Sequence, residues 1–240
     1  MKAVILCAGL GTRLRPITDS IPKVMIDIGG KPLLQYHIEW LVGQGIRDVG
    51  INLFYLPNAI TDYFGNGDQF GAKIVYSHQD KLAGTAADFK QFENFVGNDQ
   101  CLIIYGDNLF ILDLNKFKKF HNDKQGIASI AVKEWEDPTS KGIVGLDSSS
   151  RILWFKEKPK KEEVTTNIGN AGIYMVEPKI FSYIEKGTDQ DFGKDIFPLI
   201  LQSNGKIYGY KLTDYHIDIG TPETLEKGRR DIKTLYRNKP

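Results

Sequence analysis

Cysteine and histidine are scarce in this sequence, which argues against disulfides and metal centres built from these residues. The 240 residues include two cysteines, Cys7 and Cys101, and neither has a CxxC or Cys/His neighbour. We expect buried, reduced thiols rather than a disulfide or a metal site. The four histidines show no metal-ligand spacing, so we expect each of them to be structural.

An excess of one charge is also lacking, because 31 basic residues balance 30 acidic ones and the formal net charge is +1. No long run of like charges points to nucleic acid or to a membrane surface as a partner. The apolar stretch 3–10 is too short to span a membrane. It also lacks the basic region and cleavage site of a signal peptide, so we expect a cytoplasmic protein.

Glycine, in contrast, is abundant, at 24 of the 240 residues, against a usual share of about 7%. With 41% hydrophobic and 25% charged residues, the composition is that of a folded globular protein and excludes disorder as a global description. The length suits one or two domains with a large core.

Apolar runs alternate with amphipathic stretches over the first half of the chain, which is typical of a parallel sheet covered by helices. Strands are predicted at 3–7, 49–55, 73–79 and 101–105, and helices at 32–42, 57–64 and 86–96. After about residue 125, strands are predicted at 128–135, 152–156, 172–176 and 207–212, and helices at 179–185, 194–202 and 222–236. We expect an α/β protein with a Rossmann-like, mostly parallel mixed sheet flanked by helices and a smaller β-rich region. No Pro-, Gly- or Ser-rich linker divides it, so residues 1–240 are predicted to form a single domain.

The first predicted strand runs directly into the segment GLGTR at residues 9–13. Two glycines let backbone N–H groups turn toward an anion, and the basic residues supply countercharge, so this turn is predicted to hold phosphate. A dinucleotide fingerprint would need Gly or Ala in place of Leu14, and the GK[ST] of a P-loop is absent.

The run from Met1 to Leu34 resembles the signature of the sugar nucleotidyltransferases, or NDP-sugar pyrophosphorylases, whose pattern is GxGTRLxPxT, PKxM and GKPLL. Later segments of the pattern follow in order: GTA at 84–86, YGDN at 105–108, GIV at 142–144, EKP at 157–159, NAG at 170–172 and DIGTP at 218–222. The resemblance covers essentially the whole chain. We expect the catalytic α/β domain alone to use up the 240 residues, without the C-terminal extension of longer relatives.

This resemblance implies a reaction in which a sugar 1-phosphate oxygen attacks the α-phosphorus of a nucleoside triphosphate and pyrophosphate leaves. Arg13 and Lys23 would be catalytic, Arg13 by holding the triphosphate and Lys23 by contacting the α-phosphate. Asp107 and Asp218 would bind Mg²⁺, which proteins commonly hold with two carboxylates and phosphate oxygens. An acidic side chain at the end of an apolar strand, as at Asp107, is costly unless it meets a cation.

The resemblance also assigns the remaining site residues. Nucleotide-binding positions would be Leu6, Ala8, Gly9, Gly11, Thr12, Gln79, Gly84 and Thr85. Sugar phosphate-binding positions would be Gly142, Glu157, Lys158 and Asn170. The half at about 1–125 would then bind the nucleotide, and the half at about 126–240 would carry the sugar site and the second metal ligand.

The choice of substrates stays open between branches of the family. The segment 106–108 resembles enzymes that use dTTP or UTP with glucose 1-phosphate, toward which we lean, whereas 170–172 and 195–198 resemble those that guanylylate mannose 1-phosphate. A guanylyltransferase acting on a heptose 1-phosphate is a further alternative. Residues 82–87 depart from the usual PLGTAG. A cytidylyltransferase acting on phosphocholine and a non-catalytic binding module are further alternatives. A glycosyltransferase is disfavoured because Asp107 is not in a DxD motif. The expected partners are small-molecule substrates, and a homo-oligomer would be usual for the family.

Overall fold

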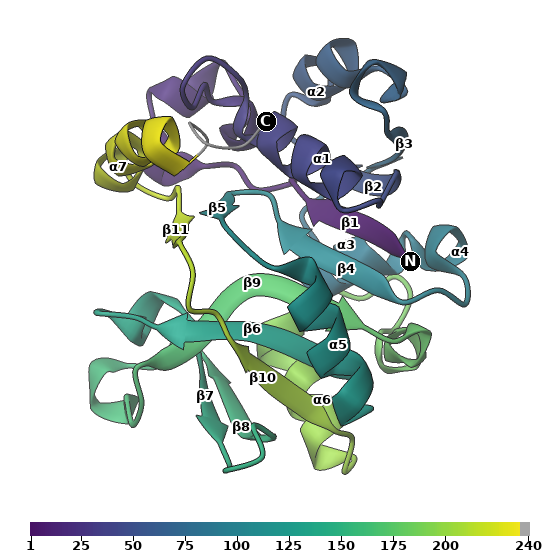
Figure 1. Ribbon diagram of the computed structural model, residues 1–240, viewed down its shortest axis with the longest axis vertical. Coiled ribbons are helices and arrows are strands. Elements are labelled where there is room, and N and C mark those ends of the chain that lie inside the picture. Colours follow the sequence, from purple (N-terminus) through teal and green to yellow (C-terminus); the bar gives the residue numbers. More distant parts are fainter. Residues whose placement is uncertain (236–240) are drawn as a thin grey trace. The chain divides into compact units, whose positions relative to one another are not determined.

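The computed structural model describes residues 1–235, which divide into two compact units that interleave along the chain (Figure 1). The first unit comprises residues 2–82, residues 105–111 and the described chain from Tyr215 onward. The second unit comprises Met1 and residues 83–104 and 112–214. Each unit is therefore built from segments that lie far apart in the sequence.

Three parallel strands form the sheet of the first unit: β1 (Lys2–Leu6), β2 (Asp48–Leu53) and β3 (Lys73–His78). A separate antiparallel pair joins β5 (Asn108–Phe110) to β11 (His216–Asp218). The helices of this unit are α1 (Leu33–Gly43), α2 (Pro57–Phe64) and α7 (Pro222–Leu235), with 3-10 turns η1 (Thr12–Leu14), η2 (Ile17–Asp19), η3 (Lys23–Met25) and η4 (Asp68–Phe70). Val4 and Ile51, in β1 and β2, are fully buried, as expected of parallel strands covered on both faces.

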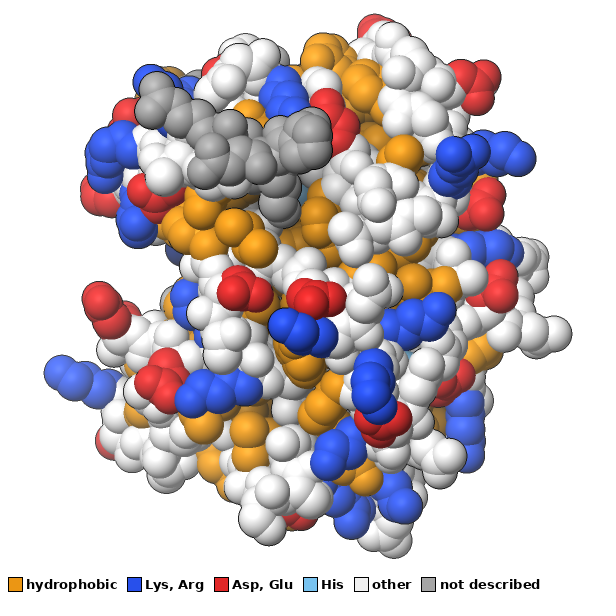
Figure 2. All heavy atoms as spheres, in the orientation of Figure 1, with side chains coloured by type: hydrophobic (Ala, Val, Ile, Leu, Met, Phe, Trp, Pro, Cys, Tyr) orange, Lys and Arg blue, Asp and Glu red, His pale blue; other side chains and the backbone are white. Residues whose placement is uncertain are grey.

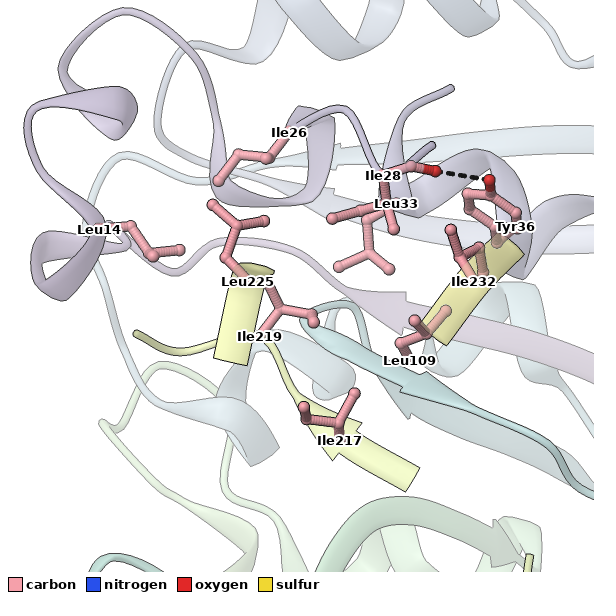
Figure 3. Close-up of a cluster of buried hydrophobic side chains, with 10 residues drawn as sticks. All are labelled: Leu14, Ile26, Ile28, Leu33, Tyr36, Leu109, Ile217, Ile219, Leu225 and Ile232. Carbon is pink, nitrogen blue, oxygen red and sulfur yellow. Dashed lines mark hydrogen bonds between the residues drawn. The ribbon is translucent and has the colours of Figure 1, made fainter. Parts of the chain in front are cut away.

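A cluster of buried side chains ties the loops of the first unit to β11 and α7 (Figure 3). Leu225 and Ile232 extend from α7 into this cluster, and Tyr36 closes it by donating a hydrogen bond to the Ile28 carbonyl oxygen at 2.6 Å. The cluster consists of Leu14, Ile26, Ile28, Leu33, Tyr36, Leu109, Ile217, Ile219, Leu225 and Ile232. Burial of this apolar surface therefore fixes the strand that carries Asp218.

The second unit contains a mixed sheet in the order β10–β6–β9–β4, with a β7–β8 hairpin paired to β9. Its strands are β4 (Cys101–Tyr105), β6 (Ala128–Glu134), β7 (Gly142–Leu146), β8 (Ile152–Glu157), β9 (Ile168–Val176) and β10 (Ile207–Lys211). Its helices are α3 (Thr85–Lys90), α4 (Glu93–Val96), α5 (Leu114–Lys124) and α6 (Phe197–Gln202), with 3-10 turns η5 (Pro138–Ser140), η6 (Lys161–Glu163) and η7 (Pro178–Tyr183) and the π-helical turn η8 (Phe192–Ile196).

The α/β class is as predicted, and several elements differ in detail. The single helix predicted at 86–96 is two short helices, α3 and α4, and the helix predicted at 179–185 is the 3-10 turn η7. The helix α5 and the strands β5, β7 and β11 were not predicted. The end of the last helix, predicted at 236, lies outside the described residues.

Acidic and basic side chains are interspersed on the face of the protein drawn in Figure 2. Among residues 1–235, no helix combines the length and the hydropathy that crossing a bilayer would require.

Candidate active site

The loop after β1 turns at Gly11, whose backbone adopts a left-handed conformation with φ of 62°. A Cβ atom at Gly11 would lie 2.9 Å from Cγ2 of Thr18 and 3.1 Å from Cβ of Lys23, so glycine is required by both conformation and space. The Thr18 hydroxyl donates to the Gly11 carbonyl oxygen at 2.9 Å and holds the turn. Gly9 has neither requirement, because a Cβ atom there would meet nothing within 4 Å.

The other residues of this loop that are predicted to bind the nucleotide differ in their solvent exposure. The side chains of Leu6 and Ala8 are buried, so only their backbone could face a ligand, whereas Gly9 and Thr12 are exposed. The Leu6 carbonyl oxygen accepts a hydrogen bond from the Gly106 N–H at 2.9 Å. At Leu6 and Ala8 a ligand would therefore meet backbone groups only.

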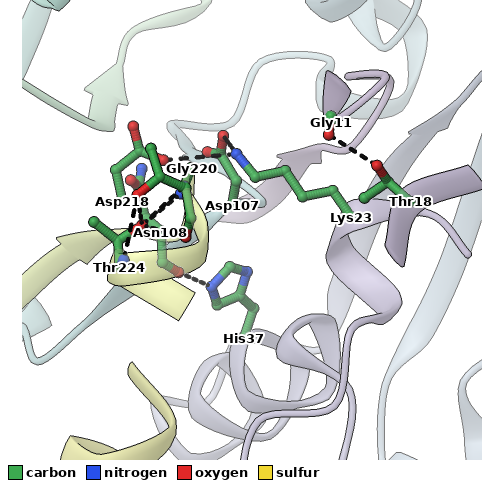
Figure 4. A network of polar contacts seen from close by, with 10 residues as sticks. Gly11, Thr18, Lys23, His37, Asp107, Asn108, Asp218, Gly220 and Thr224 are labelled. Atoms are coloured by element: carbon green, nitrogen blue, oxygen red, sulfur yellow. Dashed lines mark hydrogen bonds and ion pairs between the residues drawn. The ribbon is translucent and has the colours of Figure 1, made fainter. Parts of the chain in front are cut away.

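Lys23 lies at the centre of a polar network (Figure 4). It begins the 3-10 turn η3, and its side chain is only 9% exposed. Its Nζ atom lies 2.6 Å from Oδ2 of Asp107 and 3.6 Å from Oδ1 of Asp218. Two carboxylates distant in sequence therefore converge on one ammonium group.

The pairing of β5 with β11 brings the two aspartates together. Asp218 lies directly opposite Asn108 in this pair, and the Ile219 N–H donates to the Asp107 carbonyl oxygen at 2.9 Å. Gly106 lets the chain approach the end of β1 closely, since a Cβ atom there would lie 3.1 Å from the Leu6 carbonyl oxygen and 2.9 Å from Sγ of Cys7, the next residue. The antiparallel register thus places the side chains of Asp107 and Asp218 on the same cation.

Gly220 makes room for the guanidinium group of Arg13. A Cβ atom at Gly220 would lie 2.8 Å from Nη2 of Arg13 and 3.0 Å from Oδ1 of Asp218. The Thr224 hydroxyl accepts hydrogen bonds from the Gly220 and Thr221 N–H groups, both at 3.0 Å, and fixes the turn that leads into α7. The four predicted catalytic and metal-binding residues, Arg13, Lys23, Asp107 and Asp218, therefore form one cluster in the first unit.

This cluster fits a divalent cation. Its two carboxylates already surround a positive charge, and oxygen ligands of this kind suit Mg²⁺. Among residues 1–235, no three His, Cys, Asp or Glu side chains are grouped as a metal site, so phosphate oxygens or water would have to complete the coordination. Magnesium characteristically keeps such ligands.

Two groups beside the cluster are held neutral by burial. Burial lowers the pKa of His37 to about 4, although its Nε2 atom hydrogen-bonds the Asn108 carbonyl oxygen at 2.6 Å. Burial, with a smaller contribution from Asp107, raises the pKa of the Cys7 thiol far above its usual range. Neither Cys7 nor Cys101 forms a disulfide, and both are buried, as predicted. A buried thiol in apolar surroundings is poorly suited to act as a nucleophile.

Three of the four predicted sugar-phosphate residues meet where β7 pairs with β8 in the second unit. Gly142 lies opposite Glu157, and a Cβ atom at Gly142 would lie 2.6 Å from Oε2 of Glu157. Burial raises the pKa of the Glu157 carboxyl, and the positive charge of Lys158 partly offsets this effect. Lys158 is exposed with a left-handed φ of 44°, and its N–H donates to the Lys141 carbonyl oxygen at 3.0 Å.

Asn170 lies at an irregularity in the pairing of β6 with β9. The register shifts between Ile130 and Val132, and such bulges redirect side chains. The Asn170 amide donates to the Tyr174 hydroxyl at 2.6 Å and accepts from the Gly172 N–H at 2.8 Å. An asparagine amide has a second N–H and a second lone pair, which a ligand hydroxyl could use.

The residues predicted to contact the base are divided between the units. Gln79 follows β3 in the first unit, where its N–H donates to the Leu53 carbonyl oxygen at 2.9 Å. Gly84 and Thr85 begin α3 in the second unit, and Gly84 has a left-handed φ of 93°. The Thr85 hydroxyl donates a hydrogen bond to Oδ1 of Asp191 at 3.0 Å.

Our assignment of site residues from the sequence missed Gly106 and Gly220. Both lie inside matched segments, one before Asp107 and the other two residues after Asp218. Their closeness to the two aspartates was the available signal. Gly106 makes room for Cys7, and Gly220 makes room for Arg13. Both contacts join residues distant in sequence, so the sequence alone does not reveal them.

A family model described as nucleotidyl transferase matches residues 2–234. A UTP–glucose-1-phosphate uridylyltransferase of Synechocystis is 37% identical over 233 residues, covering 92% of this chain and 60% of that protein. A mannose-1-phosphate guanylyltransferase of Mycobacterium tuberculosis is 32% identical, covering 97% of this chain and 64% of that protein. A D-glycero-α-D-manno-heptose 1-phosphate guanylyltransferase of Campylobacter jejuni is 36% identical, covering 93% and 96% respectively.

Solved structures show the same fold. A candidate glucose-1-phosphate thymidylyltransferase of Bacillus anthracis, in complex with sucrose, has a TM-score of 0.86 at 27% identity, with 100% of this chain and 96% of that chain covered. HddC of Yersinia pseudotuberculosis, complexed with GMP-PN, has a TM-score of 0.81 at 28% identity, with 97% and 99% covered. The chain spans 52% to 64% of the length of the first curated relatives that it matches, but nearly all of the Campylobacter protein.

Proposed function

Because this chain belongs to the nucleotidyl transferase family, we propose that it transfers a nucleotidyl group from a nucleoside triphosphate to a sugar 1-phosphate and releases pyrophosphate. The observation that carries the proposal is the convergence of Asp107 and Asp218 on Lys23, with Arg13 beside Asp218. Two cationic side chains and two carboxylates at one point suit a reaction between polyanions.

The chemistry needs no nucleophile from the protein. An oxygen of the sugar 1-phosphate forms a bond to the α-phosphorus, the bond from the α-phosphorus to the bridging oxygen breaks, and its electron pair leaves with pyrophosphate. The attacking phosphate is already ionised, so no general base is required. The task of the protein is to place two anions in line and to neutralise the charge between them.

Arg13 and Lys23 have distinct roles in this proposal. A guanidinium group grips two phosphate oxygens at once, which suits Arg13 to the triphosphate. An ammonium group has three N–H donors; at most two of those on Lys23 are directed at Asp107 and Asp218. The remaining donor would contact the α-phosphate as its charge builds up.

Asp107 and Asp218 would hold Mg²⁺, the cofactor that we expect for this reaction. When bound, the metal ion would neutralise phosphate charge and make the α-phosphorus more electrophilic. The hydrogen bond from the Ile219 N–H to the Asp107 carbonyl oxygen keeps the backbones of the two aspartates together without a metal ion. The carboxylates would thus be arranged before the substrates arrive.

Glu157 would accept hydrogen bonds from sugar hydroxyls, Asn170 would both donate and accept them, and Lys158 would pair with the phosphate. Gly142 would contribute backbone groups only, because the Phe155 ring and the Glu157 carboxylate fill the space where its side chain would be. The substrates favoured by the sequence are dTTP or UTP with glucose 1-phosphate. A guanylyltransferase acting on a heptose 1-phosphate is the second candidate, because the Campylobacter enzyme of that name matches this chain over nearly its whole length.

Pyrophosphate release tests the proposal directly. The protein would be incubated with Mg²⁺, each nucleoside triphosphate in turn and a panel of sugar 1-phosphates, and the best pair identifies the substrates. We expect Lys23→Ala to lower kcat at least about 100-fold, as loss of a preorganised donor does elsewhere. Lys118→Ala, which removes an exposed lysine on α5, serves as the matched control and should keep the wild-type rate.

The proposal fails if no pair of substrates releases pyrophosphate. If instead the wild type is active and Lys23→Ala keeps most of its rate while remaining folded by circular dichroism, the reaction stands but the role of Lys23 does not. Omitting Mg²⁺ and adding a chelator should abolish release, and full activity under these conditions would contradict the metal assignment.

A further inference from the structure

A short segment of the second unit, residues 190–193, contacts the loop formed by Gly84 and Thr85. We call it the base loop, because these two residues are predicted to contact the base of the nucleotide. The Thr85 N–H and hydroxyl both donate to Oδ1 of Asp191, each at 3.0 Å. The Phe192 N–H in turn donates to the Thr85 hydroxyl oxygen at 3.1 Å. Two hydrogen bonds therefore join Thr85 to Asp191, 106 positions away, and a third joins Thr85 to Phe192.

The start of α3 depends on the same segment. The Ala86 and Ala87 N–H groups donate to the Gln190 carbonyl oxygen at 3.0 and 3.1 Å, and the Gln190 N–H donates to the Ala83 carbonyl oxygen at 2.8 Å. No side chain of its own caps this helix. Since the first N–H groups of a helix lack partners within it, residues 190 and 191 supply the missing acceptors.

Gly84 is the residue that permits this contact. A Cβ atom at Gly84 would lie only 2.6 Å from the Gln190 carbonyl oxygen, and its φ of 93° disfavours any other residue. The Gly84-Thr85 loop is thus shaped by the 190–193 segment.

Phe192 extends the same segment toward Asn170. Its ring is fully buried, and the centroid of this ring lies 5.7 Å from that of Phe89 in α3 and 5.5 Å from that of Tyr174. The Tyr174 hydroxyl accepts the hydrogen bond from Asn170 at 2.6 Å. Packing of Phe192 therefore joins the helix that follows the base loop to the side chain that holds Asn170.

Gly193 completes the set by contacting Glu157. A Cβ atom at Gly193 would lie 2.4 Å from Oε2 of Glu157 and 3.0 Å from Cε1 of Phe155. Gly193 has no left-handed φ, so glycine is needed here for space alone. The Glu157 carboxylate lies against the backbone of this segment.

We propose that Asp191, Phe192 and Gly193 are positioning residues that fix the base loop and the sugar-binding side chains as one unit, so that this segment sets selectivity for both substrates. The inference rests on the proposed function. Asp191 acts on the nucleotide through Thr85, Gly193 acts on the sugar through Glu157, and Phe192 links the two. None of the three needs to touch a substrate.

The decisive variant is Asp191→Ala, which removes the acceptor of both Thr85 hydrogen bonds. We expect the KM values for the nucleoside triphosphate and for the sugar 1-phosphate to rise about tenfold each, because small displacements of positioning groups have effects of this size or larger. The preference between the best and second-best nucleotide should fall by a similar factor. Asp191→Asn keeps an oxygen acceptor for Thr85 and should restore most of both values.

Gly193→Ala separates the two substrates. The added methyl group would displace the Glu157 carboxylate, so the KM for the sugar 1-phosphate should rise about tenfold while the KM for the nucleotide stays close to wild type. Gly43→Ala is the matched control, because a Cβ atom at Gly43 meets nothing within 4 Å and this glycine also lacks a left-handed φ.

Amide hydrogen exchange distinguishes a positioning effect from a general loss of structure. Asp191→Ala should speed exchange at Thr85, Ala86 and Ala87 while the amides of β6 and β9 keep their wild-type protection. If Asp191→Ala does not fold, a second pair of variants tests the inference. Thr85→Val removes the hydrogen bonds of the hydroxyl group and should raise both KM values, whereas Thr85→Ser retains them and should not.

This inference would be overturned if Asp191→Ala and Thr85→Val both kept the KM values and the nucleotide preference of the wild type. The proposed function would then be unaffected. Absence of turnover by the wild type with every pair of substrates would overturn the proposed function itself. A rise in KM that Asp191→Asn does not reverse would also count against the inference, because the acceptor oxygen would then not be the cause.

Discussion

Lys23 supplies the positive charge that faces both Asp107 and Asp218 in the candidate active site. Its ammonium group lies 2.6 Å from Asp107, and its side chain is almost entirely buried. Breaking a buried ion pair by removing one partner is costly, because the other charge is left uncompensated. A metal ion bound between Asp107 and Asp218, as proposed, would supply the same positive charge, so Lys23 and the metal ion would be alternative partners for these carboxylates.

Gly220→Ala tests whether the position of Arg13 matters. The new Cβ atom would lie 2.8 Å from Nη2 of Arg13, which is the end of a flexible and exposed side chain, and 3.0 Å from Oδ1 of Asp218. Arg13 should therefore move and the fold should keep its stability. We expect kcat/KM to fall at least about tenfold, with an unchanged urea midpoint.

Gly43→Ala, whose added Cβ atom meets nothing within 4 Å, is again the control in these measurements and should match the wild type in both. If Gly220→Ala retained wild-type kcat/KM, the placement of the guanidinium group beside Asp218 would have no bearing on the reaction.

At the level of single residues, the sequence was informative where a motif is continuous. The family resemblance assigned roles to Arg13 and Lys23 through the segments GTR and PK, and these roles stay predictions; in the structure Lys23 contacts Asp107, and Arg13 lies beside Gly220. The need for glycine at residues 193 and 220 could not be predicted, because it comes from Glu157 and Arg13, which approach from distant parts of the chain.

Short elements contribute most to the geometry of the site. The strands β5 and β11 have three residues each, yet their register places Asp218 opposite Asn108. Three residues are too few to show alternation, so no pattern could reveal them. The helix α5 was missed for a related reason: only Leu114, Phe117 and His121 of its 11 residues are buried, and the apolar stripe is thin.

Leu225→Ala tests how firmly α7 supports the strand that carries Asp218. Leu225 is 1% exposed and packs in the cluster that also holds Ile217 and Ile219. Removing its side chain should lower the free energy of unfolding by about 2–5 kcal/mol, measured by urea denaturation. Leu199→Ala, at a leucine that is 39% exposed, should cost far less. Equal losses in the two variants would show that the cluster does not anchor α7.

The α/β class was predictable for the whole molecule because it follows from local patterns. The buried strand β1 contains the continuous hydrophobic run Ala3–Leu6, and α1 shows helical spacing of its apolar residues. The interleaving of two units along the chain does not follow from such patterns. It depends on which distant segments pack together, and periodicity carries no information on that choice.

The pH dependence of the stability of the whole protein should reflect His37. Burial lowers its pKa to about 4 in the folded protein, below its ordinary value of 6.5. The unfolded chain then takes up a proton that the folded protein does not, so the free energy of unfolding should fall as pH drops from 6.5 toward 4. The loss attributable to His37 is on the order of 3 kcal/mol.

Urea denaturation between pH 7.5 and 4.5 measures this loss. His37→Gln keeps a donor for the Asn108 carbonyl oxygen and should show a flatter pH profile than the wild type. His78→Gln, at an exposed histidine, should retain the wild-type slope. Parallel profiles for all three proteins would mean that His37 does not contribute.

The interleaved units also have a consequence for biosynthesis. Chains are made from the N-terminus and domains generally fold as units, but the first unit takes β11 and α7 from the chain after residue 214. Lys23 and Asp107 leave the ribosome long before Asp218. Leu225 and Ile232, which complete the cluster that anchors β11, emerge later still. A nascent chain therefore contains most of the proposed active-site residues before the site can form, so we expect activity only after the first unit has been synthesised.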